Sequence, residues 1–130
     1  MNDPFAGAYI VRDINSELEA GAWRWTSRQP ELRMYLDDVR GLKLTADFTL
    51  PETGFAHTGP VTISFFINGN LLDKVRYDGP GARHFEKPVP EAWLHARWVN
   101  HIVMQPDKTW TGEGGKIYGF ILTRAGFAAI

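Results

Sequence analysis

Two segments of strict period-two alternation constrain this fold more than any other feature of the sequence. In Leu42–Leu50 every second residue is apolar, and the residues between them are Lys, Thr and Asp. Val61–Ile67 repeats the pattern, but Phe66 places an aromatic ring on the otherwise polar side. Because successive side chains of a strand point to opposite faces, both segments predict β-strands with one core face and one outer face.

The sequence Asn68-Gly69-Asn70 follows the second segment and predicts a hairpin, since Asn and Gly tolerate the positive φ angles of tight turns. A three-residue loop would place Ile63 opposite Val75, whereas a two-residue loop would place Ile63 opposite Lys74. We favour three residues because apolar partners then share a face. In that register Asp73 lies opposite a core position, which indicates a sheet edge or a bulge.

Further short, β-rich segments predict strands at residues 8–14, 23–26, 32–36, 84–87, 99–105 and 117–123. Turn-forming stretches separate them at residues 51–54, 78–81 and 112–115, and residues 90–94 predict a single helical turn led by proline. Eight or nine strands with this spacing predict an all-β fold, a two-sheet antiparallel β-sandwich of the jelly-roll kind. We expect residues 1–130 to form one such domain.

Composition limits the classes of partner. The chain has no cysteine, which excludes disulfides and thiolate metal sites. Its 14 basic and 15 acidic residues give a net charge of -1 without a long run of one sign, so neither nucleic acid nor an anionic membrane is an expected partner. No segment approaches the roughly 20 apolar residues that cross a bilayer, so no membrane insertion is expected. The first residues, MNDPFAGAY, lack the basic and apolar parts of a signal peptide.

Residues 59–105, with FFINGNLLDKV, VPEAWL and WVNHIVMQ, form a longer pattern of strands and turns. This pattern resembles the galactose-binding-like jelly-roll modules attached to many glycoside hydrolases. The resemblance implies sugar binding through loops at one end of the sandwich, and often a structural calcium ion. The sequence lacks the dense Asp, Asn and Glu cluster of a calcium loop, so we expect no metal and no cofactor. WRWTSRQPELRMYL and KIYGFILTRAGF are also similar to a group of uncharacterised bacterial domains, which implies no activity.

Carboxylate pairs for glycoside hydrolysis could be assembled from Glu86, Glu91, Asp73 or Asp107, as in any chain with fifteen acids, and only their separation in space identifies such a pair. The other usual catalytic patterns are absent. The histidines, His57, His84, His95 and His101, lack the spacing of a zinc site. No serine stands in a Gly-x-Ser-x-Gly turn. Gly112-Glu113-Gly114-Gly115-Lys116 lacks the Gly-Lys-Ser/Thr of a phosphate loop and is better explained as a hairpin turn. We therefore expect this chain not to be an enzyme.

Tryptophan is the remaining signal, because five tryptophans are many for 130 residues. Exposed rings stack on the C–H faces of sugars, although core packing is the alternative for each of them. Trp110, beside a glycine turn, is the best candidate for exposure, and Trp23 and Trp25 share one face of their predicted strand. The candidate ligand-binding residues are Trp110, Asp107, Trp23, Trp25, Arg24 and His101, with Arg28 as a further polar partner.

Two functions fit these observations. The favoured one is a non-catalytic carbohydrate-binding or accessory module with a glycan as partner. The alternative is a protein-interaction or structural domain, in which Phe66, the Trp23/Trp25 pair or an open edge strand packs against a neighbouring domain of a longer protein or a second copy. A sugar site should be a concave patch of one or two aromatic rings among polar groups, whereas an interface should be flatter, larger and more apolar.

Overall fold

The computed structural model describes residues 10–14 and 24–130. The strands of the first part are β1 (Ile10–Ile14), β2 (Arg24–Leu36), β3 (Leu42–Leu50), β4 (Val61–Ile67), β5 (Asn70–Tyr77) and β6 (Gly81–Pro88). The remaining strands are β7 (Trp98–Pro106), β8 (Trp110–Thr111), β9 (Ile117–Tyr118) and β10 (Ile121–Ala129). The helical elements are α1 (Glu52–Thr58) and the 3₁₀ turns η2 (Glu91–Trp93) and η3 (Glu113–Gly115). In the described part of the chain no helix is long and apolar enough to cross a membrane.

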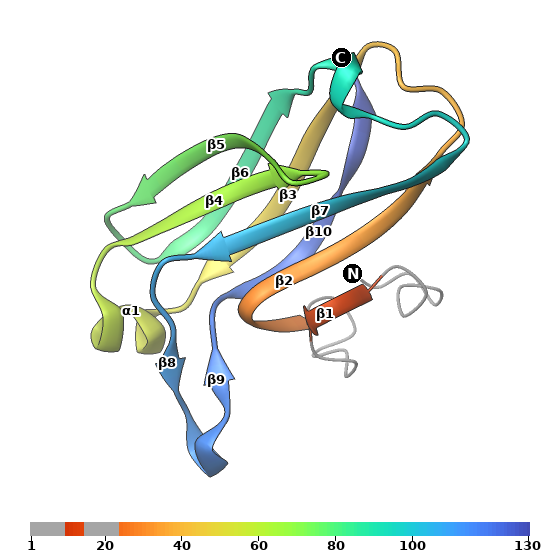
Figure 1. Ribbon diagram of the computed structural model, residues 1–130. Helices are drawn as coiled ribbons and strands as arrows, with labels where there is room; N and C mark the ends of the chain where they lie inside the picture. Colours follow the sequence, from red (N-terminus) through yellow and green to blue (C-terminus); the bar gives the residue numbers. More distant parts are fainter. Residues whose placement is uncertain (1–9, 15–23) are drawn as a thin grey trace.

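The all-β prediction is confirmed, with one large antiparallel sheet in place of two separate ones. Its strands follow the order β5-β4-β7-β2-β10-β3-β6, β1 also pairs with β2, and β8 and β9 form a small second sheet (Figure 1). The large sheet curls until it is nearly barrel-like. One layer then contains β5, β4, β7 and β2, and β10, β3 and β6 lie behind it.

Strand β2 joins the two layers into one sheet, because it pairs with a strand of each. Sequence patterns predicted two short strands at residues 23–26 and 32–36, but the structure has one strand of 13 residues. The half of β2 that begins at Glu31 pairs with β7, and the Arg24–Trp25 end pairs with β10. Pro30 lies between these two stretches. Since proline has no N–H to donate to a ladder, it suits the point where the strand changes partner.

The core lies inside the curled sheet, where the alternating apolar residues of β3 and β4 face each other. Phe65 of β4 stacks on Phe85 of β6 with ring centroids 3.8 Å apart. Asp73 of β5 forms an ion pair with Lys87 of β6 at 3.4 Å. Strands β5 and β6 stand at the two ends of the strand order, so side chains hold these ends of the sheet together. Asp73 lies at a core-facing position of β5, opposite Phe65, and Lys87 is its charged partner.

The β4–β5 hairpin combines both registers considered from the sequence. At the turn, Ile67 pairs with Asn70, which leaves a two-residue loop. The register shifts between Phe65 and Phe66, so that further from the turn Ile63 pairs with Val75 as predicted for three residues. Leu72 is the extra residue of this β-bulge, and it is buried. The bulge lets Phe66 pair with Leu71 on the turn side and Ile63 pair with Val75 further from the turn.

The predicted strands at Leu42–Leu50 and Val61–Ile67 are confirmed with the same bounds, and the predicted single turn after Pro90 appears as η2. Residues 51–54 were expected to be a turn, but α1 begins there. Glu52 suits the first turn of a helix, and Gly59 ends it with φ 68°. Seven residues are too few to show helical periodicity in the sequence.

Candidate ligand-binding groove

The outer face of the layer that contains β4, β7 and β2 carries the first candidate site. Strand register places Leu71 beside Phe66, Phe66 beside Val103, Val103 beside Glu31 and Glu31 beside Arg12. These side chains form one row across five strands. The row changes from apolar on β5, β4 and β7 to charged on β2 and β1, so one surface offers both kinds of contact.

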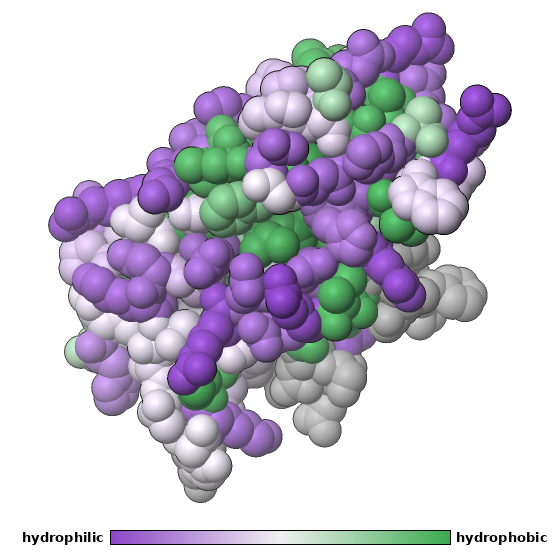
Figure 2. Space-filling model, viewed as in Figure 1, coloured by the Kyte–Doolittle hydropathy of each residue, from purple (hydrophilic) through white to green (hydrophobic). Residues whose placement is uncertain are grey.

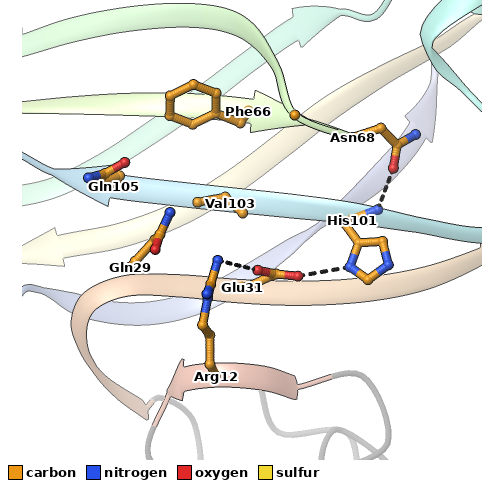
Figure 3. Close-up of a pocket in the computed structure, with 9 residues that line it drawn as sticks. Arg12, Gln29, Glu31, Phe66, Asn68, His101, Val103 and Gln105 are labelled. Carbon is orange, nitrogen blue, oxygen red and sulfur yellow. Dashed lines mark hydrogen bonds and ion pairs between the residues drawn. The ribbon is translucent and has the colours of Figure 1, made fainter.

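A cavity of about 540 Å³ opens over this row, and we call it the sheet-face groove. Its lining residues are Arg12, Gln29, Glu31, Phe66, Asn68, Gly69, His101, Val103 and Gln105. Figure 3 shows them rising from β1, β2, β4 and β7 on one side of the sheet. On the same side, Figure 2 shows apolar side chains lying among hydrophilic ones over the middle of the face.

Glu31 is the polar centre of the sheet-face groove. Its side chain is only 13% exposed and forms an ion pair with Arg12 at 2.7 Å. Its second carboxylate oxygen lies 2.9 Å from Nδ1 of His101. Because a carboxylate accepts hydrogen bonds, Nδ1 of His101 is the donor and carries a proton. Arg12 and His101 therefore fix the Glu31 carboxylate, while both partners keep other polar atoms towards solvent.

A network of hydrogen bonds between the half-buried Asn68 and the buried Asn100 supports one end of the groove. Asn68 donates from Nδ2 to the carbonyl of Trp93 at 2.8 Å and to Oδ1 of Asn100 at 2.9 Å. Its own Oδ1 accepts the backbone N–H of His101 at 2.8 Å. Asn100 in turn binds the backbone of His95 in both directions, at 2.8 and 2.9 Å. These bonds fix the β4–β5 turn against β7, so Asn68 has a structural role in addition to lining the groove.

Phe66 supplies the aromatic contact of the sheet-face groove. The ring is half-buried and points outward between Leu71 and Val103. Gln29 and Gln105 line the same groove with side-chain amides, which can donate and accept. An apolar floor with a few polar groups around it is the arrangement that binds small polar ligands with an apolar face.

A second, smaller cavity of about 400 Å³ lies beside the β8–β9 hairpin, and we call it the hairpin groove. Trp25 and Tyr118 line it together with Lys116. Trp110 lies behind them, edge-on to Trp25 at 5.9 Å and 5.8 Å from Tyr118. Trp110 also packs so closely on Gly54 of α1 that a β-carbon there would lie 2.5 Å from the indole ring. The ring is half-buried, so its main contacts are with the protein.

The predicted site residues do not form one cluster. Trp25 and Trp110 come together at the hairpin groove, whereas His101 lies in the sheet-face groove. Asp107 accepts the backbone N–H of Thr62 at 2.9 Å and so anchors the start of β4. Trp23 lies outside the described residues, and Arg28 is exposed.

Arg24 requires a correction, because a surface role was expected and the residue is buried at 8% exposure. It belongs to the inward phase of β2, as Thr26 does. Sequence reasoning also missed Glu31, Gln29 and Gln105 of the sheet-face groove. The one signal was Phe66, the aromatic residue out of phase in its strand.

Among the described residues, no group of three or more His, Cys, Asp or Glu side chains is arranged to hold a metal ion.

No known family model matches the sequence, and no curated protein matches it. By fold it belongs to the antiparallel all-β domains. A solved structure that shares this fold is a family GH115 4-O-methyl-α-glucuronidase, BtGH115A, with specificity for decorated arabinogalactans. The TM-score is 0.56 at 10% sequence identity, over 96% of this chain. The chain spans 17% of the length of that enzyme. At this identity the likeness establishes a common fold.

Proposed function

We propose that this chain is a non-catalytic accessory module that binds a glycan in the sheet-face groove. One observation carries the proposal: Phe66 offers an aromatic ring on the outer face of the sheet, next to the Arg12–Glu31–His101 network. A sugar has apolar C–H faces and polar hydroxyl edges. The apolar face of the sugar ring would pack on Phe66 and Val103. The sugar hydroxyls would bind Glu31, Gln29 and Gln105.

Two further points support a carbohydrate role. The solved protein that shares this fold is a glycoside hydrolase, and the shared part is 17% of its chain. The resemblance of residues 59–105 to galactose-binding-like jelly-roll modules points in the same direction. The assignment of this chain to the galactose-binding-like modules is part of the proposal. In those modules sugars bind through loops at one end, whereas the groove proposed here lies on the sheet face.

A second candidate function is packing against a neighbouring domain of a longer protein. Leu71 is 44% exposed and extends the apolar part of the row beyond Phe66. A partner domain could cover Leu71, Phe66 and Val103 together. This strip is short, and charged residues continue the row, so the groove fits a small polar ligand better than a broad apolar interface.

The test is a glycan array followed by titration calorimetry of the best ligand with the wild type and with Phe66→Ala. Loss of one stacking contact of about 1–2 kcal/mol should weaken binding roughly 5- to 30-fold. Phe66 points outward, so the variant should remain folded, which circular dichroism checks.

Trp98→Ala is the matched control, because Trp98 is an aromatic residue with 65% exposure that does not line the groove. The Trp98→Ala variant should bind the glycan with the affinity of the wild type. Equal loss in both variants would contradict a site at Phe66, and no binding to any glycan would favour the interface candidate.

A further inference from the structure

We infer that the ligand of the sheet-face groove is an acidic glycan, one that carries carboxylate or sulfate groups. This inference rests on the proposed function and adds the charge class of the ligand. It follows from the way the β-sheet distributes charge, because cationic side chains gather on the face that contains the groove.

Strand register identifies the residues on that face. Lys74 pairs with the outward Ser64, Arg76 with Thr62, Arg33 with His101, and Arg12 with Glu31. All four cations therefore occupy the groove face of β5, β2 and β1, and all four are exposed. Among the described residues at the paired outward positions of these strands the one acid is Glu31, which pairs with Arg12, and just beyond the end of β5 Asp78 pairs with Arg76 at 2.7 Å. The molecule as a whole has a net charge of -1, so the face differs in sign from the average.

The two kinds of charge have different positions in the groove. Glu31 lies at the centre with Arg12 and His101 already against its carboxylate. Lys74 lies on β5 opposite Ser64, which is two residues from Phe66 along β4. Arg33 lies two residues along β2 from Glu31. An anionic group would be repelled at the centre and attracted at the rim. The sugar ring would therefore lie over Phe66 with its acid groups directed towards Lys74 or Arg33.

The range of these interactions fits a bound oligosaccharide. The Debye length is about 8 Å at physiological ionic strength, and neighbouring positions of a sheet are within that distance. Exposed pairs of this kind each change affinity by less than about 5-fold. Two rim contacts would change affinity several-fold and make it depend on salt. That is a preference among glycans, because one aromatic ring and a few exposed cations are less than the long cationic groove with several stacking rings that holds a nucleic-acid strand.

Calorimetry with tetragalacturonate and with its fully methyl-esterified form tests the inference, because the two differ in charge with little change of the ring. We expect the acid to bind at least about 5-fold more tightly than the ester at low salt, and to lose most of this advantage near 0.5 M NaCl. A sulfated oligosaccharide in a third arm tells sulfate from carboxylate, and preference for either acid over the ester supports the inference.

Lys74→Glu and Arg33→Glu should each weaken binding of the acid about 3- to 10-fold and leave the ester unchanged. Lys116→Glu is the control, since Lys116 lies on the β8–β9 hairpin and should have no effect on this groove. Equal affinity for acid and ester would overturn the inference and leave the proposed function intact. Tight binding of a thymidine oligonucleotide would also overturn it. Failure of every glycan to bind would refute both.

Discussion

Replacing Asn100 by alanine should cost more stability than any single change on the surface of this domain. Asn100 is fully buried at 0% exposure. Its Oδ1 accepts hydrogen bonds from the backbone of His95 at 2.8 Å and from Nδ2 of Asn68 at 2.9 Å. Its Nδ2 donates to the carbonyls of His95 at 2.9 Å and Trp98 at 3.2 Å.

At about 1 kcal/mol net for each intramolecular hydrogen bond, four lost bonds predict a decrease of about 4 kcal/mol in the free energy of unfolding. That is a large part of the 5–15 kcal/mol typical of a domain. Urea unfolding followed by tryptophan fluorescence measures the decrease, with the slope of the transition compared to exclude a change in the unfolded state.

Asn70→Ala is the matched control for this experiment. Asn70 is in the same turn, but its bonds to backbone carbonyls are long, at 3.3 and 3.5 Å, and the residue is exposed. Its loss should cost less than about 0.5 kcal/mol. A cost below about 1 kcal/mol for Asn100→Ala would refute the view that this network fastens the turn to β7.

Two other predictions concern positions outside the groove. Gly54→Ala should destabilise the domain by about 1–3 kcal/mol, although alanine favours a helix, because its β-carbon would meet the Trp110 ring; a raised melting temperature would contradict this. Hydrogen bonds that the His84 ring donates to the carboxylates of Glu86 and then Asp47 raise the pKa of His84 above its ordinary value. The charged His84 therefore contributes its full stabilisation to the fold below the pKa of a free histidine, and this contribution is lost as the pH rises through the raised pKa. NMR titration should show this raised pKa falling in Glu86→Gln, and an unchanged midpoint would refute the contact.

The sequence predicted the strands in which one face is core and the other is polar, because alternation follows directly from strand geometry. This reasoning did not predict β2 as a single long strand. Its middle contains Arg28, Gln29 and Pro30, which look like a loop, and only tertiary pairing on both of its sides makes it one strand. The hairpin register was half predictable, since the bulge at Leu72 depends on packing across the sheet.

The sheet-face groove was not predictable, because its residues come from four strands and meet only through register. Phe66 was visible as an out-of-phase aromatic residue, but the contact between Glu31 and His101 joins positions 70 residues apart. Net charge also concealed the cationic face, since it averages over the whole surface. Tryptophan content drew attention to Trp110, whose ring the structure packs against Gly54 and Trp25.

The most direct test of the account is NMR mapping of the bound ligand on ¹⁵N-labelled protein, with the tightest-binding glycan from the array. The account predicts that the largest shift changes fall on the amides of Phe66, Val103 and Glu31 and the side-chain amides of Gln29 and Gln105, with the tryptophan indole signals unmoved. Changes centred on the indoles of Trp25 and Trp110 would contradict it and would assign ligand binding to the hairpin groove.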